Sequence, residues 1–310
     1  TAGESIVKRK NNKNKFTTGN IFTSKGYQTK FLYGGYSYFD NMKDFFQGNG
    51  YDIVDRDQFS PEEITFANVW GVCDEDMAKK AINTMNAEAK TGKPFFNHWM
   101  TVSNHRPYTY PEGKIDISPT TKSREGGVKY TDYALRKFFE MAKKQSWYSN
   151  TVFVIISDHC ASSAGKTELP MDKYRIPAMV FSEGFIKPQK FSTLMSQIDV
   201  MPTLFGILNF NYTSQFLGQN VFDENYIPRA YIATYQDLGL IKEDQLTVIS
   251  PTRKVRQYQL TLKPSTLPQE FQLYYDETLQ KTNNQKLVDK TIATYQSVSY
   301  WLKNNQLNHK

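Results

Sequence analysis

The chain has 310 residues and a formal net charge of +7, with 39% hydrophobic and 22% charged residues. This length can bury a substantial core, and no apolar run approaches the roughly 20 residues that span a membrane. The two cysteines, Cys73 and Cys160, are too few for a disulfide framework and lack the spacing of a zinc site. The basic run Lys8–Lys15 resembles a nucleic-acid or phosphate patch, but we interpret it as a solvated, frayed terminus.

The first half of the chain predicts alternating helices and strands. Apolar spacing, glycine stops and an N-cap at Asp74 define these elements. In chain order we expect a helix at 18–26, a strand at 30–33, a helix at 39–48, a short strand at 52–54, a helix at 75–91, a strand at 94–103 and a helix at 130–145. This alternation is typical of an α/β fold with a mostly parallel sheet flanked by helices.

A continuous β-branched and apolar run, Val152–Ile156, predicts a central parallel strand that is buried on both faces. The polar residues Asp158 and His159 follow it, at the position where open α/β sheets place their ligand crevices. Neighbouring side chains on a strand point to opposite faces, so the pair shares a ligand only if the chain turns there. Carboxylate and imidazole groups suit a divalent metal ion. The alternative is an Asp–His hydrogen bond that closes the turn.

A second polar cluster, Asn104–Arg106, follows the strand predicted at 94–103. Because carboxyl ends of parallel strands meet at one edge of a sheet, we expect His105 to share a crevice with Asp158 and His159. His98, in the middle of that strand, is interpreted as a core histidine. Cys160 would suit a soft metal, but a small buried residue in a tight turn fits it better.

The last part of the chain changes in character. A strand at 176–181 and a helix at 197–208 complete the alternating pattern, with Asp199 as a cap for the helix. Short alternating strands at 231–235, 246–250 and 255–260 then predict a small antiparallel sheet, followed by a helix at 287–302. We therefore divide the chain into an α/β core, residues 1–228, and an antiparallel subdomain with a helix, residues 229–310.

Three stretches together resemble the sulfatase-like branch of the alkaline phosphatase superfamily, and within it the lipoteichoic acid synthases and phosphoglycerol transferases. They are FLYGGYSYFDN (31–41), FFNHWMTVSNHRPY (95–108) and ISDHCASSAGKTELPMDKYRIP (156–177), and QIDVMPTLFGIL (197–208) supports them. The similarity runs in the same order from about Lys25 to Leu208.

The resemblance implies a metal-assisted transferase. A Thr nucleophile attacks a phosphodiester, releases a lipid alcohol and passes the head group to a second alcohol. Asp158 and His159 match the metal ligands of the family, with Mn²⁺, Mg²⁺ or Zn²⁺ as the ion, and His105 matches its active-site histidine. The substrate-binding residues implied are Tyr38, Asp40, Asn41, Asn104, Arg106 and Arg175. The alternative role for Asp40 is that of a helix N-cap.

The departures from the family pattern are specific. The Thr nucleophile and an acidic metal ligand of the family lie upstream of the Gly26–Tyr27 pair, and we expect them before Thr1, in a longer parent protein. Thr17, Thr18 and Thr23 lack the right context. The head-group loop has Asp40 and Met42 where glycerol-phosphate enzymes carry Trp and Arg, which counts against a glycerol-phosphate substrate. Arg175 stands where two-metal members carry a histidine.

Three functional classes follow. The first is an envelope transferase that moves a phosphoglycerol- or phosphoethanolamine-type head group from a phospholipid to an envelope acceptor. Its parent protein would be extracytoplasmic, tethered to the membrane by segments absent here, and would bind no nucleic acid. The second is a sulfatase or phosphodiesterase, although Cys73 and Cys160 lack the Cys/Ser-x-Pro/Ala-x-Arg context of a sulfatase nucleophile. The third is a non-catalytic binding domain on the same scaffold.

Overall fold

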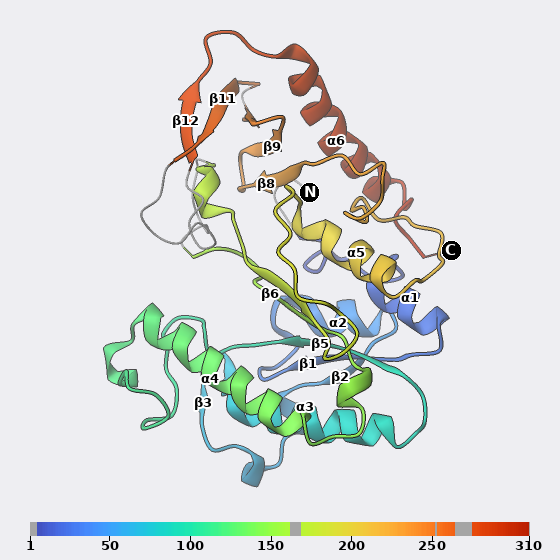
Figure 1. Ribbon diagram of the computed structural model, residues 1–310, viewed down its shortest axis with the longest axis vertical. Coiled ribbons are helices and arrows are strands. Elements are labelled where there is room, and N and C mark those ends of the chain that lie inside the picture. Colours follow the sequence, from blue (N-terminus) through green and yellow to red (C-terminus); the bar gives the residue numbers. More distant parts are fainter. Residues whose placement is uncertain (1–4, 162–168, 252, 264–274, 310) are drawn as a thin grey trace. The chain divides into compact units, whose positions relative to one another are not determined.

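A computed structural model of the chain describes residues 5–161, 169–251, 253–263 and 275–309 (Figure 1). The chain is organised as two compact units. We call residues 6–151, with 182–184 and 309–310, the N-terminal unit, and residues 152–181 and 185–308, with 1–5, the C-terminal unit. This division falls after Thr151, whereas the boundary expected from the sequence at 228/229 stays a prediction.

The N-terminal unit is built on a three-stranded parallel sheet with the order β2-β1-β5. Leu32 of β1 stands opposite Val54 of β2 and Trp99 of β5. The helices and strands of this unit are α1 (Thr18–Ser24), β1 (Gln28–Tyr33), η1 (Phe39–Asn41), α2 (Met42–Gln47), β2 (Asp52–Val54), η2 (Arg56–Gln58), η3 (Pro61–Glu63), β3 (Ala67–Asn68), β4 (Gly71–Val72), α3 (Asp74–Ala89), β5 (Phe95–Met100), η4 (Pro119–Thr121), α4 (Arg124–Ala142) and η5 (Tyr148–Asn150).

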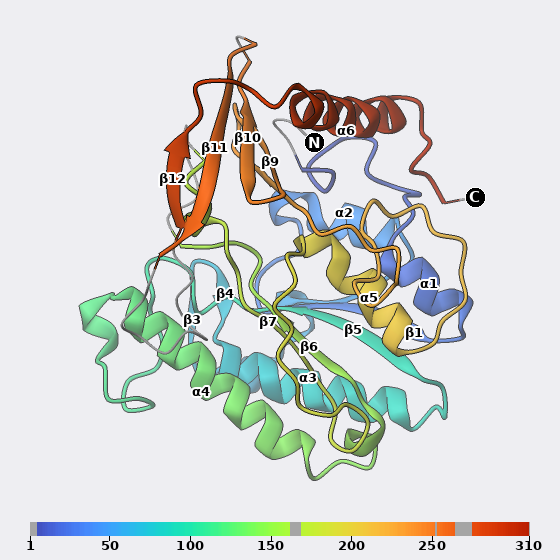
Figure 2. The same ribbon diagram turned by 45° about the horizontal axis from the view of Figure 1, so that its top comes forward.

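Helices cover both faces of this sheet. Figure 2 shows α1 and α2 on one side and α3 and α4, which run alongside each other, on the opposite side. Phe31 and Leu32, adjacent on β1, are both fully buried, as expected for a strand between two layers. Phe31 packs with Met42, Phe46 and Tyr51 on the side of α2. The predicted buried strand at 30–33 is therefore confirmed.

The basic run near the start of the chain is ordered against this unit, which corrects our interpretation of it as frayed, whereas most of its side chains are solvated as expected. Lys15 is buried, and its main-chain N–H donates to the side chain of Asn49 at 2.5 Å. Asn49 in turn donates to the main-chain oxygen of Asn12 at 2.9 Å. Lys8 and Lys13 form ion pairs with Asp40 and Asp44. Polar partners inside the fold, which composition does not reveal, hold the run in place.

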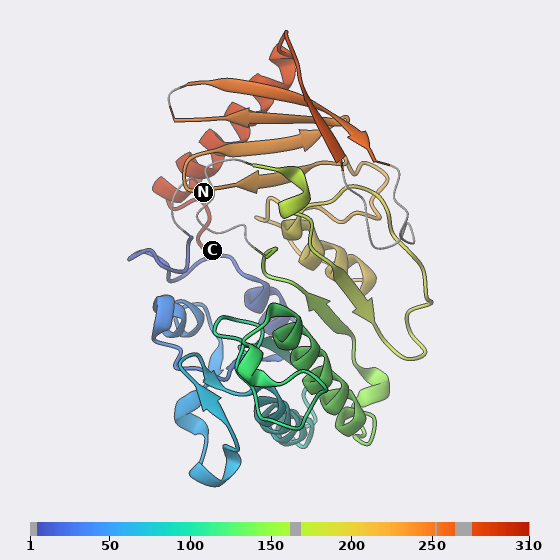
Figure 3. The same ribbon diagram turned by 90° about the vertical axis from the view of Figure 1, so that its left-hand side faces the viewer.

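The C-terminal unit contains a two-stranded and a five-stranded antiparallel sheet, the second in the order β12-β11-β10-β9-β8. Figure 3 shows α6 packed along one face of the larger sheet. The elements of this unit are β6 (Phe153–Ile156), η6 (Met171–Lys173), β7 (Ala178–Phe181), η7 (Gln197–Asp199), α5 (Val200–Ile207), β8 (Ala230–Ala233), β9 (Leu238–Lys242), β10 (Gln245–Ile249), β11 (Val255–Leu262), β12 (Tyr275–Leu279) and α6 (Gln285–Lys303). The predicted α/β fold with a C-terminal antiparallel sheet and helix is confirmed.

The strand β6 differs from its prediction. It pairs antiparallel with β7, with Ile156 opposite Ala178, and all four of its residues are only half-buried. An apolar run favours burial but does not determine which strand pairs with it. The expectation of a central parallel strand at this position was therefore wrong.

Candidate functional site

The turn after β6 brings Asp158 and His159 together. The main-chain N–H of His159 donates to Oδ1 of Asp158 at 2.8 Å, so the chain turns immediately after the strand. His159 Nε2 then lies 3.4 Å from Asp158 Oδ2. Both side chains are exposed, His159 to 60% and Asp158 to 80%. The turn that the sequence required for a shared ligand is present.

A main-chain carbonyl fixes the tautomer of His159. Its Nδ1 lies 2.8 Å from the main-chain oxygen of Cys160. Because a carbonyl oxygen only accepts hydrogen bonds, a proton is assigned to Nδ1, which leaves Nε2 as the ring nitrogen that faces Asp158. Metal-ligating histidines commonly donate their second ring N–H to a carbonyl or carboxylate in this way.

The separation of the two groups fits one small cation. Ligand atoms about 2.1 Å from a tetrahedral ion are about 3.4 Å from each other, the distance between Nε2 and Oδ2. Asp158 and His159 could therefore supply two ligands to a divalent ion. Within the described ranges, no group of three or more His, Cys, Asp or Glu side chains is arranged to hold a metal.

Two neighbours complete this turn. The thiol of Cys160 donates a hydrogen bond to the main-chain oxygen of Arg175. Burial raises the pKa of this thiol, which disfavours the thiolate that a soft metal would need. Arg175 is exposed and belongs to the same unit. Residues 162–168, part of the third family-like stretch, lie outside the described residues.

In the N-terminal unit, the loop after β5 carries Asn104, His105 and Arg106, and all three are exposed. His105 Nδ1 lies 3.0 Å from the main-chain oxygen of Arg106, so Nδ1 is again the protonated nitrogen and Nε2 remains for chemistry. His98, on β5 itself, packs edge-on against Phe31 and Phe46, but its side chain is exposed, so it is not the core residue that we expected.

Sequence reasoning missed Trp70. Its ring lies 4.1 Å from that of His105 and 5.4 Å from that of Phe39, and its Nε1 donates to the main-chain oxygen of Arg106. Trp70 thus connects the loop after β1 with the loop after β5. A single tryptophan in an irregular segment has no periodic signal, and in the sequence only Gly71 adjoins it.

Glycines allow Trp70 to reach this position. A Cβ on Gly35 would lie 2.2 Å from the main-chain oxygen of Trp70, and one on Gly71 would lie 2.3 Å from that of Gly34. Gly71 also has φ +142°, which side-chain-bearing residues rarely adopt. The backbone after β1 and the backbone around Trp70 are therefore in direct contact.

The loop after β1 presents the predicted head-group residues. Tyr38 is 73% exposed and stacks on Tyr36 with 5.6 Å between ring centroids. Asp40 and Asn41 have φ +50° and +66°, values that Asp and Asn tolerate better than most residues. Asn41, not Asp40, is the N-cap of α2, so the capping alternative for Asp40 was wrong; its carboxylate lies 2.8 Å from Lys8 Nζ.

A buried carboxylate holds the exit of β5. Asp74 accepts hydrogen bonds from the main-chain N–H groups of Val102 at 2.8 Å and Ser103 at 3.1 Å, and from Thr131 at 3.3 Å. Cys73 is the N-cap of α3, so Asp74 is the first residue of the helix and not its cap as expected. The carboxylate therefore positions the segment that leads directly to His105.

The sequence model of the sulfatase family matches residues 5–210, more than half of the chain. The chain therefore belongs to the sulfatase family. It is similar over its whole length to a solved protein of the alkaline phosphatase superfamily from Vibrio parahaemolyticus, with a TM-score of 0.88 and 32% identity over 99% of this chain and 73% of that one. Enzymes of this superfamily generally use a divalent metal ion.

Lipoteichoic acid synthases are among the relatives. The protein of Staphylococcus aureus (strain USA300) is 28% identical over 225 residues, which cover 65% of this chain and 34% of that protein. The chain thus spans about a third of the length of this relative. The solved lipoteichoic acid synthase LtaP from Listeria monocytogenes shares the fold, with a TM-score of 0.59 and 21% identity over 77% of this chain and 66% of that one. The resemblance stated from the sequence is confirmed.

No helix in the described parts of the chain combines the length and apolar character needed to cross a membrane.

Proposed function

We propose that this chain is part of a metal-dependent transferase that moves a phosphoglycerol- or phosphoethanolamine-type head group from a phospholipid to an envelope glycan or lipid. The observation that carries the proposal is the turn at Asp158 and His159, in which two metal-ligand types face each other at 3.4 Å with the imidazole tautomer already set. The similarity to lipoteichoic acid synthases supports the transferase class.

The chemistry divides among the residues as follows. A divalent ion held by Asp158 and His159 would polarise the phosphoryl oxygens and lower the pKa of the nucleophile. The family resemblance supplies a Thr side chain as that nucleophile, upstream of Gly26. It would lose its hydroxyl proton to solvent, attack as the alkoxide and be released as the alkoxide in the second step. As its oxygen bonds to phosphorus, the bond from phosphorus to the lipid oxygen breaks, and the departing alkoxide needs a proton.

His105 is suited to supply this proton. With Nδ1–H directed at the Arg106 oxygen, a protonated ring holds its second proton on the outward Nε2. After donating it, the neutral ring accepts the proton of the acceptor alcohol, whose oxygen attacks the phosphothreonine and releases the Thr. His105 is thereby restored. That His105 and Asp158 act in one crevice stays a prediction.

The loop after β1 favours an amine-bearing head group. The Asp40 carboxylate forms an ion pair with the ammonium group of Lys8 at 2.8 Å, which shows that it can bind an ammonium group. Exposed aromatic rings such as Tyr38 bind cations through their faces. Asn104, Arg106 and Arg175 are proposed to bind the phosphate. Of the two head groups, phosphoethanolamine is therefore the one that this loop suits better.

The cellular setting follows from these substrates. A phospholipid donor and an envelope acceptor are both available on the outer side of the bacterial cytoplasmic membrane. We therefore place the active protein there, tethered by segments outside the present chain. Lys8 and Lys13 of the basic run form ion pairs within the N-terminal unit, and we propose that no nucleic acid is a partner.

Hydrolysis on the same scaffold is the second candidate, because the family takes its name from sulfatases. Neither cysteine is a suitable nucleophile. Cys73 is buried with a pKa raised to about 11 by burial, and Cys160 donates to the Arg175 oxygen. A non-catalytic binding domain remains the third candidate.

The test uses the complete gene product with Mn²⁺. Transfer of a labelled head group from phosphatidylethanolamine or phosphatidylglycerol is measured beside hydrolysis of p-nitrophenyl sulfate, in the wild type and in Asp158→Ala. We expect transfer in the wild type and a loss of at least about a hundredfold in the variant. Sulfate hydrolysis without transfer would favour the hydrolase, and equal transfer by both proteins would overturn the site assignment.

A further inference from the structure

The metal-binding turn depends on a residue outside it. Gln197, in η7, donates its side-chain amide to two successive main-chain oxygens, those of Ser157 at 3.0 Å and Asp158 at 2.9 Å. The ladder with β7 ends just before, with the bond from the Ser157 N–H to Pro177 at 3.3 Å. The Gln197 amide thus holds the backbone at the point where strand pairing no longer does.

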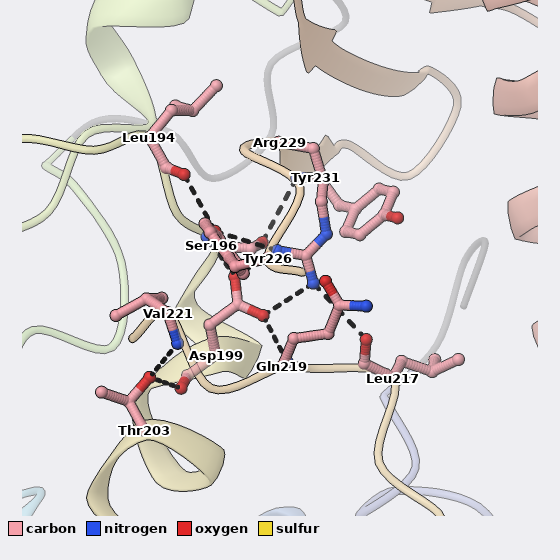
Figure 4. Close-up of polar contacts among 10 residues, drawn as sticks. All are labelled: Leu194, Ser196, Asp199, Thr203, Leu217, Gln219, Val221, Tyr226, Arg229 and Tyr231. Carbon is pink, nitrogen blue, oxygen red and sulfur yellow. Dashed lines mark hydrogen bonds and ion pairs between the residues drawn. The ribbon is translucent and has the colours of Figure 1, made fainter. Parts of the chain in front are cut away.

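The backbone around Gln197 is held in place by the hydrogen bonds of Asp199. Asp199 is fully buried and pairs with Arg229 through two bonds of 2.6 and 2.7 Å (Figure 4). Its carboxylate also accepts the main-chain N–H groups of Ser196 and Gln219, each at 2.8 Å. The residues on either side of the Gln197–Ile198 pair are therefore fixed.

Further bonds hold the same turn from the side of α5. Thr203 donates its hydroxyl to the main-chain oxygen of Asp199 at 2.7 Å and accepts the N–H of Val221 at 3.1 Å. The guanidinium group of Arg229 lies over the rings of Tyr226 and Tyr231, and Figure 4 shows Tyr231 beside Arg229. All of these residues belong to the C-terminal unit, like the Asp158–His159 turn.

We propose that Gln197 is a positioning residue for the metal-binding pair. It sets the path of the backbone through Ser157 and Asp158, and so the separation of Asp158 Oδ2 and His159 Nε2, without touching the ion or the substrate. The Asp199–Arg229 pair acts behind it as a fixed support. The inference rests on the proposed metal-dependent function, because it assigns Gln197 to the same site.

The experiment measures Mn²⁺ affinity of the complete gene product by calorimetry, together with thermal unfolding without metal. The variants are Gln197→Ala, Gln197→Asn, whose side chain is one methylene too short to reach both oxygens, and Asp158→Ala. Gln189→Ala, at an exposed glutamine of the same unit, is the matched control. Residues that orient metal ligands typically contribute 10–100-fold to affinity.

We expect Gln197→Ala and Gln197→Asn to weaken Mn²⁺ binding about 10–100-fold with the metal-free melting temperature unchanged, and Gln189→Ala to bind like the wild type. If Asp158→Ala loses Mn²⁺ but both Gln197 variants bind within twofold of the wild type, the positioning role is overturned while the metal site stands. If Asp158→Ala itself binds normally, the proposed site fails, and the role of Gln197 fails with it.

Discussion

His105 is the residue whose replacement separates chemistry from binding. His105→Ala removes the outward Nε2 and leaves the proposed metal ligands Asp158 and His159 unchanged. We expect turnover of the complete gene product to fall by about 10²–10⁴-fold, the usual contribution of a general acid–base group, with Mn²⁺ affinity unchanged. His309→Ala, at an exposed histidine near the end of the chain, is the control. A loss below about threefold would contradict the role.

Cys73 predicts a specific pH dependence. Burial raises the pKa of its thiol from 9.0 to about 11, so the folded state holds the proton more tightly than the unfolded state. The stabilisation is complete below pH 9 and is lost as pH rises toward 11. We expect the free-energy advantage of the wild type over Cys73→Ala, measured by urea unfolding, to shrink over that interval. A constant difference would contradict the raised pKa.

At the residue scale, the turn between Asp158 and His159 was predictable from the sequence, whereas the roles of the site residues stay predictions. Asp158 and His159 face each other because a carboxylate directly after a strand can accept the next N–H and start a turn. Trp70 was not predicted, because its importance arises from contacts with Phe39 and His105, which lie far from it in the chain. The capping roles given to Asp40 and Asp74 failed because other partners, Lys8 and the Val102–Ser103 backbone, hold their carboxylates.

At the level of elements, α3 and the exit of β5 are joined by Asp74. Asp74→Asn keeps one acceptor oxygen but loses the second, so one of the N–H groups of Val102 and Ser103 lacks its partner. We expect a loss of about 1–3 kcal/mol in unfolding free energy and, because His105 follows two residues later, a lower kcat. Unfolding titrations and initial rates check both. Asp76→Asn, on the same helix, serves as the comparison, since its partners lie around Thr65.

The buried pair between Asp199 and Arg229 links α5 with the segment before β8. Arg229→Met leaves the Asp199 carboxylate without its cation in a fully buried position, and we expect a cost of about 3–5 kcal/mol. The double variant Asp199→Asn/Arg229→Met removes the charge as well and should cost less than the single one. Chemical denaturation of the three proteins tests this. An Arg229→Met variant within about 1 kcal/mol of the wild type would refute it.

Elements were predictable where one pattern decided them. The helices α2, α3 and α6 and the strands β1, β10 and β11 carry clear periodicity and occur close to their expected ranges. The N-terminus of α4 was not expected, because Gly126 and Gly127 suggest a loop, whereas Ser123 caps the helix by accepting the Gly126 N–H at 3.1 Å. The prediction that β6 lies in a parallel sheet was wrong, because the sequence of one strand does not determine which strand pairs with it.

For the whole molecule, the proposed metal site predicts a link between metal binding and folding. An ion that binds the folded protein but not the unfolded chain adds about 2.7 kcal/mol to the unfolding free energy at a hundred times its Kd. We expect Mn²⁺ to raise the melting temperature of the wild type with concentration and to leave that of Asp158→Asn unchanged. Differential scanning fluorimetry over a metal series measures this. An equal rise in both proteins would indicate ions bound elsewhere.

The two histidines of the proposed site share one kind of hydrogen bond, which is made to the main chain. His105 and His159 each direct Nδ1–H to the carbonyl of the next residue, Arg106 or Cys160. Every amino acid has that carbonyl, so no point substitution at the neighbouring position deletes it. The hydrogen bond made by each Nδ1 is therefore insensitive to a change of side chain at the next position. Evolution can vary positions 106 and 160 while both rings keep their orientation.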